Sequence, residues 1–561
     1  MTNKNVALRK TKQWVKYMLK KPGKLSEILR LQAENKKKNE EAKANKTENM
    51  NKAEEGIPGS ICIVKERLQA VFSECSDFVL REINSADNQV IILIAYIDGL
   101  IDMQLLNQYT IEPLTSITRE EGKEGKEGNT SITETIKKQV ITNSDIKEIK
   151  TFSKTISSIL SGNALVFIEG ESIALEVGIQ STKGRAVAEP DTEISIRGSR
   201  EGFVENLRVN TTLLRRTIKN PNFKIESMTL GEQTQTDIAL CYIKGLANDK
   251  IVQEARRRLA KIKIDAVLES GYIEHFIEDN VIRLFPVVGN SEKPDKVAAK
   301  LLEGRVAILC DGTPIVLTVP YLFVESIQST EDYYGHPVYS SVMRILRLSS
   351  LLITMGLPAL YVALVAFHQT VIPFKLLLTM AASREGIPFS PFVEALLMIT
   401  TFELLREAGV RMPRPIGQAV SIVGAIVLGE AAVQAGIASA PMVIVTALTA
   451  ICSFIVPPLL QISLILRYVL LIAANMFGLF GISIVFVIIF AYLCTKRSFG
   501  VPYLSPFAPM NAQDLKDTFI VVPIWAMITR PRTLTWDKES IKTRTVSKLS
   551  PNEEGLKSEK P

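Results

Sequence analysis

The chain has 561 residues, which is too many for one hydrophobic core and predicts several domains. It is 47% hydrophobic and 22% charged, a mixture that is high in apolar residues for a soluble protein and high in charge for a purely membrane-embedded one. The charges are unevenly placed, because residues 348–494 hold only eleven charged side chains among 147. The composition therefore predicts a soluble part followed by a membrane-embedded part, and it excludes collagen-like, wholly disordered and small disulfide-stapled proteins.

The net charge of +7 is concentrated at the start of the chain. Residues 1–56 hold fifteen basic and seven acidic side chains, whereas the remaining residues are almost neutral. This pattern predicts a disordered basic arm. Attraction of the arm to anionic lipid headgroups is the functional alternative. Nucleic acid is not a predicted partner, because no base-reading module follows the arm.

An internal repeat is the most informative feature of the soluble part. The sequence AYIDGL at 95–100 recurs as CYIKGL at 241–246, and GNALVFIEGESIALEV at 162–177 recurs as GRVAILCDGTPIVLTV at 304–319. Short apolar runs alternate with amphipathic stretches around both copies. We predict two related α/β lobes, at 57–228 and 229–345, followed by a membrane domain at 346–495. Residues 496–561 are predicted to form a cytoplasmic tail that is disordered after about 532.

The first lobe ends in a stretch of mixed charge that could bind a ligand or hold the two lobes together by ion pairs, and we favour the ion pairs. The residues concerned are Glu189, Glu193, Arg197, Arg200 and Glu201. A helix is predicted to follow, with Ser199 capping its N-terminus.

Four apolar segments are long enough to cross a bilayer: 348–367, 416–438, 441–466 and 469–494. The segment 392–405 is shorter and carries Glu394 and Glu403, so we predict that it is re-entrant or interfacial. Basic residues flank the first and last spans, which predicts that both ends are cytoplasmic. This topology leaves Arg406, Arg411 and Arg414 on the outside, contrary to the usual charge distribution.

Polar side chains inside a membrane are costly and need a reason. Glu430 and Gln434 share one helix face, where they either line a path for ions or are satisfied inside a packed bundle. Together with Glu394 and Glu403 they are the candidate pore-lining residues. Arg467 is predicted to be a solitary interface anchor. Four small residues are candidates for close helix packing: Ala425, Gly429, Ala432 and Gly436.

No pattern in the sequence predicts catalysis. There is no phosphate-binding glycine motif, the six cysteines form no CxxC pair, and the three histidines are dispersed. We therefore predict no catalytic residue, no metal site, no cofactor and no enzymatic activity.

Several motifs together resemble the A subunits of GerA-type spore germination receptors. They are SREGIPF at 383–389, FELLREAG at 402–409, EDYY at 331–334, GVPYLSP at 500–506, and the Glu-Pro and Arg-Gly pairs at 189–190 and 197–198. The resemblance covers about residues 57–535. Ser199 stands where the family pattern has a proline.

The resemblance implies a multi-pass protein of the spore inner membrane whose N-terminal domain is cytoplasmic. It implies a transporter-like B subunit and a lipoprotein C subunit as partners, and self-association into a nutrient-gated cation channel. The alternatives are a non-conducting scaffold that relays a signal and, less favoured, a secondary transporter.

Overall fold

The computed structural model describes residues 56–84, 91–115, 146–181, 190, 193, 197–279, 284–413, 429–511, 514–524, 527, 530, 531 and 534. The chain forms two compact units, residues 1–73 with 77–182, and residues 74–76 with 183–561. The predicted basic arm, up to residue 55, and the tail after 534 lie outside the described residues.

The first unit is built around a five-stranded antiparallel sheet with the strand order β1-β2-β4-β5-β3. The strands are β1 (Phe78–Asn84), β2 (Ile91–Ile97), β3 (Ile146–Ile149), β4 (Ala164–Ile168) and β5 (Ala174–Val177). The helices are α3 (Ile61–Val71), α4 (Met103–Leu106), η1 (Asn107–Ile111), α5 (Glu112–Thr115) and α7 (Phe152–Leu160). The central strand β2 is almost entirely buried, as its run of apolar residues predicts.

The second unit begins with a lobe that has the same sheet, in the order β6-β7-β9-β10-β8. Its strands are β6 (Phe223–Leu230), β7 (Thr236–Ile243), β8 (Gly289–Ser291), β9 (Val306–Cys310) and β10 (Val316–Val319). Its helices are α8 (Leu207–Thr217), α9 (Asp249–Ala260), α10 (Ser270–Ile277) and α11 (Pro294–Leu302). The predicted lobe boundary at 228 lies inside β6, because β6 pairs with β7 along its whole length.

Strand register confirms that the two lobes are related. Ile92 lies opposite Ile168 in the first sheet, and Ile238 lies opposite Cys310 in the second, so both offsets of the sequence repeat are preserved. The helix that follows the repeated hexapeptide is also capped at the equivalent residue, Asp102 in one lobe and Asn248 in the other. Two α/β lobes of one architecture are therefore present, as predicted.

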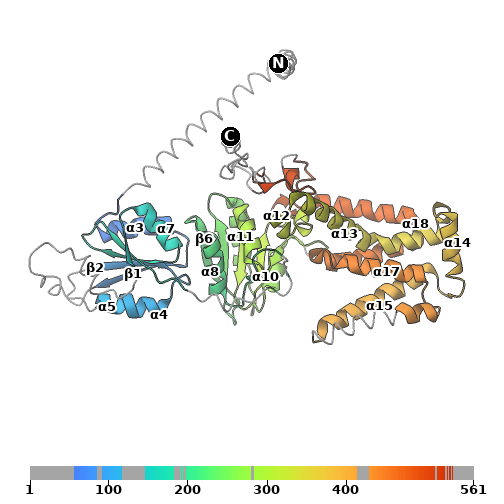
Figure 1. The fold of residues 1–561 in the computed structure, drawn as a ribbon, viewed down its shortest axis with the longest axis horizontal. Helices are drawn as coiled ribbons and strands as arrows, with labels where there is room; N and C mark the ends of the chain where they lie inside the picture. Colours follow the sequence, from blue (N-terminus) through green and yellow to red (C-terminus); the bar gives the residue numbers. More distant parts are fainter. Residues whose placement is uncertain are drawn as a thin grey trace, which may run out of the picture. The chain divides into compact units, whose positions relative to one another are not determined.

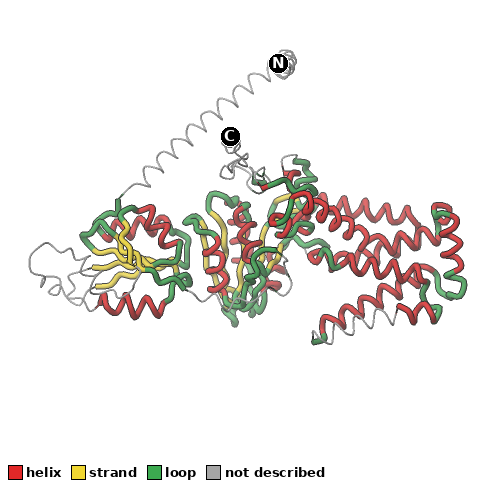
Figure 2. The backbone as a smooth tube through the Cα atoms, viewed as in Figure 1, coloured by secondary structure: helices red, strands yellow, loops and turns green. Residues whose placement is uncertain are grey.

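A series of helices, the longer of them apolar, follows the second lobe (Figure 2). They are α12 (Glu331–Tyr334), α13 (Pro337–Ala366), η5 (Gln369–Val371), α14 (Phe374–Ala382), α15 (Pro391–Arg411), α17 (Ala440–Ser453) and α18 (Leu460–Thr495), with η4 (Phe323–Ser326) and η6 (Pro457–Leu459) as short 3-10 turns. Among the described residues, α13 and the stretch 457–495 are long and apolar enough to cross a membrane. The predicted span at 416–438 lies largely outside the described residues.

The last helix, α18, is a hairpin rather than one straight rod. Gly478 has φ 58° and ψ −137°, which breaks the helix into arms 460–477 and 479–495. A Cβ placed on Gly481 would lie 2.2 Å from the carbonyl oxygen of Ala473, eight residues earlier, so the chain folds back on itself. The predicted spans 441–466 and 469–494 are therefore wrong in their limits, because α17 ends at Ser453 and the chain turns at Gly478.

Contacts between the helices fix their directions. Glu394 at the start of α15 lies beside Ser439, which contacts Tyr361 late in α13, whereas Glu403 lies at the level of Thr354, earlier in α13. The helix α15 thus runs antiparallel to α13, back toward the second lobe, over 21 residues. The segment 392–405, predicted to be re-entrant or interfacial, is thus part of a 21-residue helix.

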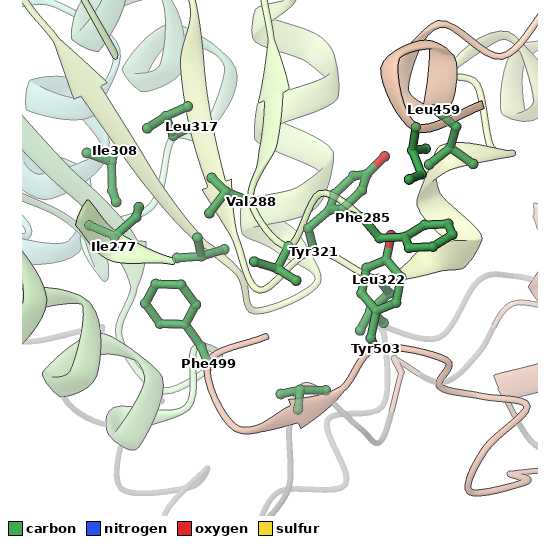
Figure 3. Close-up of a cluster of buried hydrophobic side chains, with 14 of the residues drawn as sticks. Ile277, Phe285, Val288, Ile308, Leu317, Tyr321, Leu322, Leu459, Phe499 and Tyr503 are labelled. Carbon is green, nitrogen blue, oxygen red and sulfur yellow. The ribbon is translucent and has the colours of Figure 1, made fainter. Parts of the chain in front are cut away.

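The C-terminal segment returns to the second lobe. Its strands β11 (Arg497–Ser498) and β12 (Val501–Pro502) form a small hairpin, and η7 (Asp514–Asp517) follows. Figure 3 shows Tyr503 of this segment beside Phe285 and Leu322 of the lobe, and Phe499 on the side of Ile277 and Val288. The hydroxyl of Ser498 accepts the Tyr321 amide hydrogen bond and donates to the Val287 carbonyl. The lobe and the helical bundle consequently share one continuous hydrophobic core.

Candidate functional site

Glu394 is fully buried at the contact between α15 and α17. Its Oε1 accepts a hydrogen bond of 2.6 Å from the Ser439 amide and another from the Ser439 hydroxyl. Because Ser439 is the N-cap of α17, the carboxylate also lies at the positive end of that helix. Arg384 Nη2 lies 3.7 Å from the other oxygen. Glu394 therefore joins two helices inside the protomer rather than facing an open path.

Glu403 forms a buried ion pair with Arg467, which is 1% exposed. The Glu403 Oε1 to Arg467 Nη1 distance is 2.9 Å, and Arg406 binds the second oxygen of Glu403 at 2.6 Å. Arg467 Nε also donates to the backbone carbonyl of Thr354. The prediction that Arg467 is a solitary anchor is wrong, because its guanidinium links α18 to α13 and α15. Its partners are far from it in the sequence, so the pairing could not be seen in the local pattern.

Glu430 and Gln434 are exposed and face each other, as their spacing predicts. Gln434 Nε2 donates to Glu430 Oε1 at 3.2 Å. Within the described part of the bundle, this is the single hydrogen bond that either side chain makes. Glu430 and Gln434 therefore differ from the other two predicted pore-lining residues. Glu394 and Glu403 are bound by residues of other helices, whereas Glu430 and Gln434 are exposed and bind each other.

The predicted helix-packing residues have different roles. Gly429 packs against α17, since a Cβ there would lie 3.5 Å from Val443 Cγ1. Gly436 instead ends its helix with φ 65°, and the two following amides donate to the carbonyl of Ala432. A Cβ on Gly436 would lie 3.2 Å from the Gly386 carbonyl oxygen, so the absence of a side chain here allows the two backbones to approach closely. Ala425 lies outside the described residues.

Within the mixed-charge stretch between the lobes, Glu193 makes a defined contact with the second lobe. Glu193 binds Lys296 of α11 and accepts hydrogen bonds from the Ser291 hydroxyl and the Glu292 amide. Burial by itself raises the pKa of Glu193, but Lys296 and these hydrogen bonds hold the pKa below its ordinary value. Glu193 therefore ties its segment to the second lobe.

The other charged residues of that stretch differ from Glu193 in exposure or lie outside the described residues. Arg197, Arg200 and Glu201 are exposed, and Glu189 lies outside the described residues. Ser199 does not cap the following helix, because the helix begins at Leu207 and its cap is Asn206.

A polar junction that sequence reasoning did not identify joins the second lobe, α13 and the C-terminal segment. Arg344 is fully buried, and its Nε donates to Asp332 at 2.8 Å while its Nη1 donates to Asp517 at 2.8 Å. Arg347 also binds Asp332, and the Tyr333 hydroxyl donates to Asp517. The EDYY motif, together with Arg344 and Arg347 after it, is the sequence feature from which this junction could have been predicted.

A buried lysine beside this junction predicts a pH-dependent stability. Lys300 Nζ lies 3.1 Å from Glu325 Oε2, yet burial lowers the Lys300 pKa to about 8. The unfolded chain has the ordinary value of 10.5 and therefore binds more protons above pH 8, so this group makes stability rise with pH from about 8 toward 10.5. We expect the thermal midpoint of Lys300→Met to lack that rise between pH 7.5 and 9.5. An equal pH slope in the variant and the wild-type chain is the contrary result.

Comparison with known proteins identifies the family. Residues 66–533 match the family model described as Bacillus/Clostridium GerA spore germination protein. The chain belongs to this family. Spore germination protein KA of Bacillus subtilis is 45% identical over 462 residues, which cover 82% of this chain and 84% of the relative. The uncharacterized membrane protein YfkQ of the same organism is 44% identical over 473 residues, covering 83% and 90%.

A solved structure is also similar, the N-terminal domain of the A subunit of the Bacillus megaterium spore germinant receptor GerK3. It is 33% identical, with a TM-score of 0.38, and the match covers 48% of this chain and 98% of that domain. The GerA resemblance seen in the motifs is thus confirmed, and the chain is an A-type germination receptor subunit and a membrane protein. The family membership also agrees with the prediction of a non-enzymatic protein.

Proposed function

We propose that this GerA protein is a subunit of a nutrient receptor in the spore inner membrane, where it works with a transporter-like B subunit and a lipoprotein C subunit. In this proposal several copies assemble around a path through which cations leave when the nutrient arrives. Family membership and the apolar helices support the receptor and membrane parts of the proposal.

The observation that carries the channel proposal is the contrast among the membrane carboxylates. Glu394 and Glu403 have partners from other helices, whereas the Glu430 carboxylate is exposed and bound only by Gln434 among the described residues. A carboxylate facing hydrocarbon is costly. Glu430 and Gln434 are therefore the residues that we propose to face water or a second copy in the assembly.

The distribution of basic residues supports a cytoplasmic position for the lobes. Because α15 runs back toward the second lobe, Arg406 and Arg411 lie at the same end of the bundle as Arg344 and Lys496. Clustering of arginine and lysine at one end follows the rule for cytoplasmic loops. In this arrangement Arg406 and Arg411 are placed on the cytoplasmic side, in agreement with that rule.

Replacement of Glu430 tests the channel proposal. We expect Glu430→Gln to slow nutrient-triggered cation release from spores by roughly tenfold. This factor corresponds to an increase of about 1.4 kcal/mol in the free-energy barrier to release. Glu407→Gln is the matched control, because Glu407 is an exposed carboxylate that pairs with Arg411 at the C-terminal end of α15. Receptor abundance is measured in both strains. Unchanged release in Glu430→Gln spores removes the pore assignment.

A non-conducting signal relay is the second candidate, favoured by the Arg344 junction. The second lobe is fixed to the first membrane helix by the ion pairs of Arg344 with Asp332 and Asp517. A movement of the lobe is therefore transmitted to the helix, and a movement of the helix to the lobe. Reconstitution of the receptor complex in liposomes separates the two candidates. Nutrient-dependent ion flux supports the channel, and its absence in an assembled complex supports the relay.

A further inference from the structure

A cavity of about 520 Å³ lies between the end of α13, η5, α14 and the start of α15. Its walls are mostly apolar and include Val365, Leu377, Met380 and Ala381, with Gln369 and Arg384 as polar members. The volume is within the range of small-ligand sites. Of the residues described above, Arg384 lines this cavity, where it also lies beside Glu394.

The neighbouring helix α14 indicates the surroundings of the cavity. It has nine residues, too few to cross a bilayer, and none of them is buried within the protein. Phe374, Leu376 and Leu378 are each more than half exposed. Figure 1 shows α14 at the end of the helical bundle remote from α11. An apolar helix exposed at the end of membrane-crossing helices is suited to contact with lipid acyl chains.

The charged side chain at the cavity is Arg384, whose guanidinium also neighbours Glu394 and Tyr361. Its Nη2 donates to the Phe389 carbonyl at 3.3 Å and lies 3.7 Å from Glu394, which is beyond hydrogen-bond distance. Its buried Nη1 has no hydrogen-bond partner among the described residues. A guanidinium has five donors and binds phosphate oxygens well, so an anionic headgroup matches the unmet donors.

We propose that this cavity binds an anionic membrane lipid, with its phosphate at Arg384 and an acyl chain along α14. The apolar walls receive the chain, and the arginine distinguishes an anionic from a zwitterionic headgroup. A lipid that binds this site in the folded protein alone stabilises the fold by mass action. This proposal does not depend on the channel proposal, because its test measures the stability of the protein and not ion flux.

The test measures the thermal midpoint of the full chain in detergent with added phosphatidylglycerol, phosphatidylcholine of the same chains, or inorganic phosphate. We expect phosphatidylglycerol to give a saturable rise of a few degrees, and the other two additions to give none. Equal effects of both lipids overturn the headgroup assignment. A full effect of inorganic phosphate overturns the lipid assignment in favour of a free anion.

Three variants locate the effect. Arg384→Gln removes the charge and Ala381→Trp fills the cavity while keeping Arg384, and both are expected to lose the phosphatidylglycerol response. Arg411→Gln, which removes an exposed arginine paired with Glu407, is expected to keep it. If Arg384→Gln does not fold, Ala381→Trp alone decides the result. A retained response in Ala381→Trp places the lipid elsewhere and overturns the proposal.

Discussion

Alanine at Gly478 or Gly481 is expected to prevent the α18 hairpin from forming. Gly478 has a backbone conformation that a residue with a Cβ rarely adopts, and the added carbon would lie 2.8 Å from His368 Cε1. At Gly481 the added carbon would meet the Ala473 carbonyl oxygen at 2.2 Å, and a backbone atom cannot move aside by changing rotamer. Each change is expected to destabilise the bundle by about 3 kcal/mol or more.

The measurement is the yield and thermal midpoint of the full chain after size-exclusion chromatography in detergent. Gly356→Ala is the matched control, because its Cβ would make only ordinary contacts with Phe486, the nearest at 3.7 Å. We expect this control to behave as the wild-type chain. A Gly481→Ala protein with a wild-type midpoint contradicts the hairpin.

The second large effect is expected at the ion pair between Glu403 and Arg467. Glu403→Gln leaves a buried guanidinium without its countercharge, which costs about 3–5 kcal/mol in comparable pairs. Arg467→Met leaves Glu403 paired with Arg406, so its loss of stability is expected to be smaller than that of Glu403→Gln. The combined variant Glu403→Leu with Arg467→Met is expected to recover most of the loss, because well-packed apolar residues replace a buried pair at little cost.

The structure gives a specific reason to expect this recovery. Arg467 Nη2 and Thr354 Oγ1 are buried without a hydrogen-bond partner in the described part of the chain, so the polar cluster is incompletely satisfied. Partly satisfied buried networks are costly. Thermal midpoints of the wild-type chain, Glu403→Leu, Arg467→Met and the variant that combines these two substitutions form a mutant cycle. A double variant as unstable as Glu403→Gln contradicts the argument.

Sequence patterns predicted features that depend on local spacing. The strand β2 follows from a continuous apolar run, and the contact between Glu430 and Gln434 follows from the four-residue period of a helix. The repeat predicted two lobes of one architecture, because the same pattern of strands and glycine turns forms the same sheet twice. The start of α8 was misplaced, since both Ser199 and Asn206 are suitable caps and only tertiary contacts select one.

Partnerships between distant residues could not be predicted in this way. Arg467 and Glu403 are 64 residues apart, and nothing local distinguishes a paired intramembrane arginine from a solitary one. Gly478 lies within an apolar run that is typical of an uninterrupted helix, so its turn was missed. The carboxylates Glu394 and Glu430 have similar local contexts, yet one caps α17 and the other remains exposed.

The amino-acid order by itself determined the division into soluble lobes and apolar helices, the repeated sheet and the family, because these depend on composition, periodicity and short motifs. Tertiary structure alone decided the helix directions, the hairpin and the countercharge of each buried ionic group. The physical reason is that a buried charge is stabilised by whichever opposite charge or hydrogen-bond donor lies within a few ångströms in space. Neighbours of that kind are set by how the helices pack, which spacing along the chain does not specify.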